Sequence, residues 1–192
     1  MSGVWQPGED DGQTPRAVRR VVALILDEGF AHLTLDDLAA RLHCSKSTLY
    51  RLADSKEQLV RAATVHFFRG ATEQVEASVA GAVDARDRIR RYLEAVGEQL
   101  RPASPRFMED LAADPAVREV YERNTRFAAR RVQELITEGV AAGELRDAHA
   151  AFVGDVAAAA MVRIQQRQVA AAAGLDDAQA YEELAILLTR GL

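Results

Sequence analysis

The stretch over residues 34–59, TLDDLAARLHCSKSTLYRLADSKEQL, constrains this chain more than any other part of it. Its first residue, Thr34, can cap a helix, and Asp37 stands where the acid of a capping box belongs. His43-Cys44 predicts a turn, and Ser45 can cap a second short helix that runs to residue 52. Two short helices joined by a tight turn form a helix-turn-helix, whose second helix fits the major groove of DNA.

The second helix of this motif is rich in polar and basic side chains. Cys44 and Leu49 are its apolar anchors against the first helix, which leaves the other side chains to face outward. Lysine and arginine can contact guanine or phosphate, and hydroxyls can contact bases or backbone. We therefore predict base or phosphate contacts for Lys46 and Arg51, groove contacts for Ser47 and Thr48, phosphate contacts for Tyr50 and Lys56, and a backbone contact for Thr34.

These residues resemble the tetracycline-repressor-like (TetR) family of transcriptional regulators. The likeness lies in LAARL at 38–42, CSKSTLY at 44–50 and KEQL at 56–59, within a matching region of about fifty residues from 16 to 61. The chain departs from the family at Leu52-Ala53, where an aromatic or His followed by Phe is usual. It departs again at Asp36, where some members have a basic residue.

The resemblance implies an all-α fold with a DNA-binding head and a helical body. In this family the body encloses a cavity for a small ligand, whose binding alters the separation of the two heads of a dimer. The implied function is a ligand-responsive repressor that binds a palindromic DNA operator as a homodimer, with no cofactor.

The composition agrees with a helical protein of the cytoplasm. The chain has 192 residues, 48% of them apolar, and alanine, leucine and arginine are abundant. A single cysteine permits no internal disulfide and suits a reducing compartment. We find no signal-peptide pattern and no apolar run near the roughly twenty residues that span a membrane. We therefore expect a cytoplasmic protein without a membrane partner.

The net charge of −5 conceals an uneven distribution. Residues 15–61 carry eight basic and six acidic side chains, whereas the segment before them is −3 and the remainder is −4. The basic excess lies where the motif lies, which favours nucleic-acid binding, although a solvated charged surface would give the same count.

Apolar periodicity and capping residues divide the whole chain into about nine helices. We predict a mobile tail over 1–14, a helix-turn-helix DNA-binding domain over 15–61 and a ligand-binding and dimerisation domain over 62–192. The expected helices span residues 15–28, 35–42, 46–52, 56–79, 85–100, 107–112, 115–139, 149–172 and 176–188.

Candidate ligand-binding residues lie in the expected body, where large apolar side chains recur beside a few polar ones. Each apolar candidate is better explained as a core residue, and each arginine as a surface group. The candidates are Phe67, Tyr92, Val96, Phe107, Met108, Phe127, Met161 and Arg163, with Gln99, Arg126 and Gln165 as further polar groups.

The last two helices indicate dimerisation. The helix over 149–172 is apolar almost all round, and leucines and isoleucine on the final helix offer it a partner surface. Two such pairs could meet across a two-fold axis as a four-helix bundle, or both helices could complete a monomeric core. A dimer would also serve DNA binding, because two recognition helices roughly 34 to 36 Å apart can contact the two halves of a palindrome.

No catalytic or metal-binding pattern stands out. The four histidines are scattered, and the chain has no phosphate-binding glycine loop, GxSxG or HExxH motif. We therefore expect no enzyme and no metal. The alternative function is a helical protein-interaction module with a vestigial helix-turn-helix, which steep weakening of DNA binding by salt would exclude.

Overall fold

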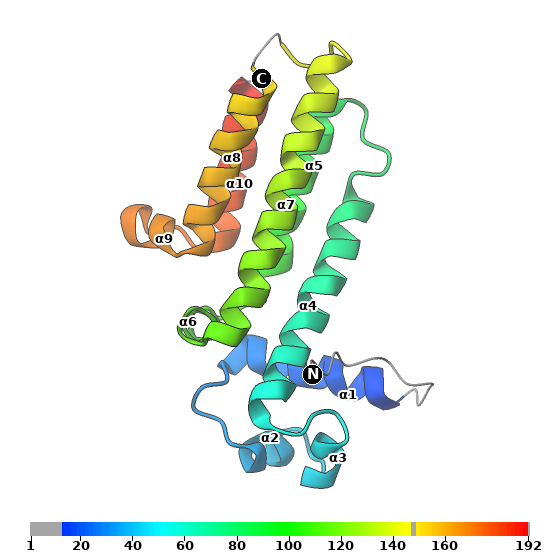
Figure 1. Cartoon of the computed structure of the whole chain (residues 1–192), viewed down its shortest axis with the longest axis vertical. Helices are drawn as coiled ribbons and strands as arrows, with labels where there is room; N and C mark the ends of the chain where they lie inside the picture. Colours follow the sequence, from blue (N-terminus) through cyan, green and yellow to red (C-terminus); the bar gives the residue numbers. More distant parts are fainter. Residues whose placement is uncertain (1–12, 147–148, 192) are drawn as a thin grey trace, which may run out of the picture.

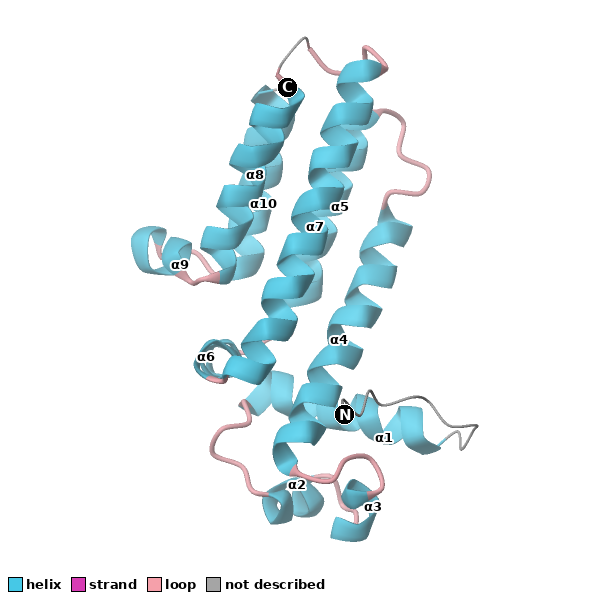
Figure 2. Cartoon of the chain, in the orientation of Figure 1, coloured by secondary structure: helices cyan, strands magenta, loops and turns pink. Residues whose placement is uncertain are grey.

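The computed structural model describes residues 13–146 and 149–191, and every regular element in these ranges is a helix (Figures 1 and 2). The elements are α1 (Gln13–Glu28), α2 (Leu35–Arg41), α3 (Lys46–Tyr50), α4 (Lys56–Ser78), α5 (Ala85–Leu100), α6 (Pro105–Ala113), α7 (Pro115–Ala141), α8 (Ala150–Gln165), α9 (Gln168–Ala173) and α10 (Asp177–Gly191). The predicted all-α fold is confirmed. The predicted mobile tail falls mostly outside the described residues.

Helices α1, α2 and α3, which we call the head, gather at one end of the molecule around the start of α4 (Figure 1). Their shared core contains Val21 and Ile25 of α1, Leu38 of α2 and Leu49 of α3, all at most 2% exposed. Helix α1 ends as predicted at Gly29, whose φ of +76° is a conformation that favours glycine. Burial of these side chains holds two helices of seven and five residues that would not be stable alone.

Helix α4 leaves the head and runs along the remaining helices, which we call the body (α5–α10). In the body α7 packs on α8 and α5 packs on α10, and both α5 and α7 also contact α4. Tyr92, Tyr121, Tyr181 and Ile136 are among the fully buried side chains at the centre of this bundle. Long amphipathic helices with a shared apolar core explain the elongated shape seen in Figure 2.

Head and body also meet through α6, whose Asp110 binds the end of α1. One Asp110 oxygen, Oδ2, accepts hydrogen bonds from the backbone N–H groups of Phe30, at 2.6 Å, and Ala31, at 2.8 Å. Beside this contact the rings of Phe30 and Phe107 meet edge to face, with their centroids 6.1 Å apart. The predicted boundary between domains at residues 61 and 62 stays a prediction, and these contacts cross it.

The helix predicted over 149–172 is wrong as a single element. It ends at Gln165, and α9 begins at Gln168 after a corner in which Arg167 has a φ of +61°. The Arg167 guanidinium donates to Asp177 Oδ1 at 2.7 Å, and Asp177 is only 5% exposed. A partly buried ion pair therefore holds the left-handed residue that breaks the helix. The chain has ten helices in its described residues rather than about nine.

Candidate nucleic-acid interface and body pocket

The first helix of the motif begins with the capping box that the sequence predicts. Thr34 Oγ1 accepts from the Asp37 backbone N–H at 3.2 Å, and Asp37 Oδ2 accepts from the Thr34 backbone N–H at 2.8 Å. The Thr34 hydroxyl also donates to Asp37 Oδ2, at 2.6 Å, and this hydrogen bond, followed by the one from the Thr34 backbone N–H, lowers the pKa of the Asp37 carboxyl. The cap fixes where α2 starts and leaves Thr34 exposed at the tip of the head.

The recognition helix α3 has one buried side chain and an exposed polar surface. Ser45 caps it by accepting from the Thr48 backbone N–H at 3.2 Å, and Leu49 anchors it at 2% exposure. Ser47 lies 2.7 Å from the Ser45 hydroxyl and is exposed, whereas Thr48 is half-buried. Tyr50 is 52% exposed. Donors and acceptors that suit base edges and phosphates therefore project from a short anchored helix.

Lys46 is paired within the head. Its ammonium group lies 2.6 Å from Asp36 Oδ1 of α2, with the two side chains 51% and 69% exposed. Asp36 is one of the two places at which the chain departs from the family pattern. The pair is open to solvent, so it contributes little to stability, but it holds the ammonium group beside a carboxylate.

Other basic side chains at the head differ in whether they bind groups of the protein itself. Lys56 donates from Nζ to the carbonyl of Ala31 at 3.1 Å, close to the cap of α4. Arg20 donates to the Leu42 carbonyl. Arg51 is exposed and has no ion pair within the described part of the chain. Arg51 is therefore the basic group of the motif most available to an outside anion.

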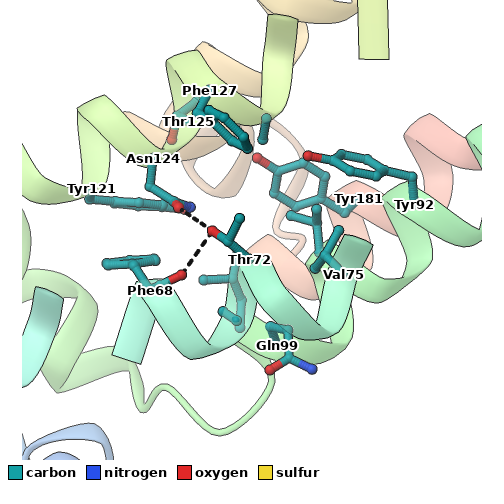
Figure 3. Close-up of a pocket in the computed structure, with 14 residues that line it drawn as sticks. Phe68, Thr72, Val75, Tyr92, Gln99, Tyr121, Asn124, Thr125, Phe127 and Tyr181 are labelled. Carbon is teal, nitrogen blue, oxygen red and sulfur yellow. Dashed lines mark hydrogen bonds between the residues drawn. The ribbon is translucent and has the colours of Figure 1, made fainter. Parts of the chain in front are cut away.

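The structure also contains a pocket between α4, α5, α7 and α10 (Figure 3). Its cavity volume is about 30 Å³, within an atom-free space of about 430 Å³ that includes open solvent at its mouth. Of the predicted ligand-binding residues, Tyr92, Val96 and Phe127 line it, as does the polar candidate Gln99. The predicted residues that lie elsewhere are Phe67, which is half-buried, Phe107, Met108 and Met161, which are core residues, and the exposed Arg163.

The prediction missed Phe68, Tyr121 and Tyr181, which supply most of the aromatic wall. Phe68 takes the buried place expected for Phe67, and its ring stacks on Tyr121 with centroids 5.1 Å apart and an interplanar angle of 12°. The Tyr121 hydroxyl donates to Asp177 Oδ2 at 3.2 Å. This bond joins the pocket wall to the ion pair at the corner between α8 and α9.

A third feature is an exposed apolar face on α8 and α10. Phe152 and Val156 of α8 are 65% and 44% exposed, and Ile186 and Leu187 of α10 are 42% and 68% exposed. Large apolar side chains grouped on the surface are typical of protein contacts.

Metal and membrane sites were sought in the same part of the chain. Across residues 13–146 and 149–191, no three His, Cys, Asp or Glu side chains gather as a metal site would need. The helices described there are all too short or too polar to cross a membrane.

Comparison with known proteins finds a family match for the head and solved structures that share the whole fold. Residues 21–63 match the family model of bacterial regulatory proteins, tetR family. No protein of curated function matches the chain. Among solved structures, a transcriptional regulator from Saccharomonospora viridis in complex with choline has a TM-score of 0.69 at 17% identity, covering 92% of this chain and 95% of that one.

Two further structures share the fold over nearly the whole chain. A regulator of the TetR/AcrR family from Thermobifida fusca has a TM-score of 0.66 at 23% identity, with 94% of this chain and 98% of that chain covered. The fatty acid degradation regulator FadR from Bacillus halodurans has a TM-score of 0.64 at 13% identity, with 96% and 98% covered.

Proposed function

We propose that the chain is a transcriptional regulator of the TetR family, which represses transcription as an operator-bound homodimer that a small molecule releases from DNA. The observation that carries the proposal is the exposed polar surface of α3, anchored by Leu49 and capped by Ser45. Regulators of this family are not enzymes, which agrees with a chain in which no catalytic residue is expected.

Each head would place α3 in a major groove. Lys46 and Arg51 then face base edges or nearby phosphates, and Ser47 and Thr48 contact the groove. Tyr50, Lys56 and Thr34 fix the register through phosphates. Lys56 would exchange its hydrogen bond to the Ala31 carbonyl for a phosphate oxygen. A helix of five residues contacts few bases, so specificity requires two heads.

The apolar face on α8 and α10 supplies the contact for a homodimer. Phe152 and Leu187 are its most exposed members, at 65% and 68%. A two-fold axis through this face makes a four-helix bundle and presents the two heads to one side of a palindrome.

Leu187→Glu should convert the dimer to a monomer, measured by light scattering after size exclusion. Val83→Glu is the matched control, since Val83 is 84% exposed in the connection between α4 and α5. A wild-type monomer at micromolar concentration, or a dimer that survives Leu187→Glu, would contradict this interface.

The pocket supplies the response to an effector. Helix α4 begins in the head at its Ser55 cap, and Phe68, Thr72 and Val75 of the same helix line the pocket. A ligand that displaces α4 would therefore change the orientation of the head. The S. viridis neighbour is described in complex with choline, which supports a small-molecule effector for this fold.

The deciding experiment is selection of bound sequences from a random duplex library, followed by affinity measurements at two salt concentrations. We expect one palindrome, bound by a dimer with an affinity that falls steeply as salt rises. Lys46→Ala should weaken operator binding roughly 5- to 150-fold. Arg86→Ala, an exposed arginine on α5 far from the head, should leave it unchanged.

Two results would overturn the proposal. A folded dimer that enriches no duplex at low salt would favour the protein-interaction module. Equal losses on operator and random DNA for Lys46→Ala would make Lys46 a phosphate contact without a role in specificity.

A further inference from the structure

The pocket in the body has an unusual chemical lining. Fourteen residues line it and none of them is charged. Five contribute aromatic rings, namely Phe68, Tyr92, Tyr121, Phe127 and Tyr181. An anionic ligand would lose its water here without meeting an ammonium or guanidinium group, which is unfavourable. The lining therefore disfavours carboxylates and phosphates.

The rings come from four different helices and face one space. Phe68 and Tyr121 stack to form one side, while Tyr92 of α5 and Tyr181 of α10 extend from the other (Figure 3). Phe127 stands near the mouth, where it is 43% exposed. Aromatic faces arranged around a space attract positive charge through their quadrupoles.

The polar atoms of the pocket are not fully used by the protein. Thr125 is 2% exposed, and its hydroxyl oxygen is buried without a hydrogen-bond partner. Asn124, by contrast, accepts from the Thr72 hydroxyl at 3.1 Å. A buried hydroxyl without a partner is costly, so a ligand group or a water molecule at this place would be stabilised.

Ionised groups behind the lining carry a negative excess. Burial, followed by the Glu76 carboxylate, raises the pKa of the Tyr92 phenol, and Glu134 acts in the same direction while Arg131 opposes it. Burial and Asp177 likewise raise the pKa of Tyr181, and Arg167 offsets Asp177 at Tyr121. Three carboxylates thus face two guanidinium groups around the tyrosines, which favours a cation in the space between them.

We propose that the effector is a compact organic cation, an alkylated or quaternary ammonium compound, held on the faces of Tyr92, Tyr121, Tyr181 and Phe127. This inference rests on the proposed function only in treating the pocket as the effector site. The ammonium group of the ligand would contact aromatic faces and hydroxyl oxygens. A hydroxyl or carbonyl on the same ligand would form a hydrogen bond with the Thr125 hydroxyl.

The test compares three probes of similar size by calorimetric titration of the full chain without DNA. Phenyltrimethylammonium is the cation, tert-butylbenzene has the same shape without charge, and benzoate is the anion. We expect the cation to bind at least tenfold more tightly than the other two. A result in which tert-butylbenzene or benzoate binds as tightly, or in which no probe binds, would overturn the proposal.

Variants locate the binding. Phe127→Leu should weaken the cation roughly three- to thirtyfold, the range of one cation–π contact. Val83→Leu is the matched control, because Val83 is 84% exposed in the connection between α4 and α5 and does not line the pocket. Both positions are exposed enough to accept leucine without unfolding. Equal affinities in the two variants would place the cation elsewhere and refute the assignment.

DNA binding is measured separately, so that the two proposals fail separately. If phenyltrimethylammonium binds in the pocket and leaves DNA affinity unchanged, the ligand class stands and effector control fails. If an uncharged or anionic compound binds in the pocket and releases the DNA, effector control stands and the organic cation is refuted.

Discussion

The contact between Asp110 and the end of α1 offers the sharpest test of how the head is fixed to the body. A single carboxylate oxygen accepts from two consecutive backbone N–H groups, at 2.6 Å from Phe30 and 2.8 Å from Ala31. Asp110→Ala removes both acceptors. The Phe30 N–H is partly buried and would lose its partner, whereas the Ala31 N–H is exposed and can bind water.

The magnitude follows from these two environments. A hydrogen bond to a charged acceptor contributes about 1.5–3 kcal/mol, and an exposed one contributes less because water replaces it. We therefore expect Asp110→Ala to lower the free energy of unfolding by about 2 kcal/mol. For a chain of this length that loss corresponds to a fall of roughly 4–8 °C in Tm.

Urea unfolding followed by circular dichroism measures this change. Glu109→Ala is the control, because Glu109 is the exposed neighbour on the same helix. Gly29→Ala tests the contact from the other side, since a Cβ at Gly29 would lie 2.6 Å from Asp110 Oδ2 and the backbone has a φ of +76°. If Asp110→Ala and Glu109→Ala unfold within 0.5 kcal/mol of each other, roughly the scatter of surface substitutions, the reasoning is refuted.

Three smaller predictions concern the head and the packing of the body. Asp36→Asn should release Lys46 and strengthen binding to random DNA severalfold, measured by fluorescence anisotropy at low salt; an unchanged affinity would show that the 2.6 Å pair does not compete with DNA. The pKa of Asp37 should lie below its ordinary 3.8 by carboxyl NMR titration, and Thr34→Ala should raise it. Because the folded-state pKa is lowered, the cap's stabilisation is present above pH 3.8 and is lost as the pH falls through the folded-state pKa; a titration unaffected by Thr34→Ala would contradict this. Gly139→Ala should lower the free energy of unfolding by about 1–3 kcal/mol in urea, because the new Cβ would lie 2.5 Å from a side chain of α5, and no loss would show that α5 and α7 can separate freely.

Several helix starts in the head and the body could be predicted because their signals are local. Ser45, Ser55 and Asp84 each accept a hydrogen bond from a backbone N–H three residues on, as capping residues do. Such a signal depends on only a few consecutive residues, so sequence alone displays it. The helix-turn-helix and the starts of α3, α4 and α5 were predicted correctly for this reason.

The break between α8 and α9 could not be predicted in this way. Residues 149–172 are good helix formers without a glycine or proline near Arg167. The left-handed conformation of Arg167 is held by Asp177, which lies in the next long helix. A tertiary ion pair overrides the local preference, and its partner is identified only once the two helices are packed.

The pocket was missed in part for the same reason. Phe67 and Phe68 are adjacent, so both lie near the edge of the apolar stripe of α4, and periodicity cannot choose between them. In the structure the ring of Tyr121 stacks on Phe68, and this contact places Phe68 in the pocket wall. Tyr121 and Tyr181 stand at helical spacing among ordinary core residues, and what distinguishes them is that helices distant in sequence leave a space between their rings.

A binding site between helices therefore depends on which side chains fail to fill the bundle, and this is a property of the packed structure. The candidate interface of the head, by contrast, is readable from the sequence, because its side chains are consecutive residues that one short helix exposes together. Tyr121 connects the two levels, since its ring walls the pocket and its hydroxyl binds the Asp177 that fixes the corner after α8. A ligand that shifts this ring would act on the same carboxylate that orders α8 and α10, the helices of the proposed dimer contact, as well as on α4, which begins in the head.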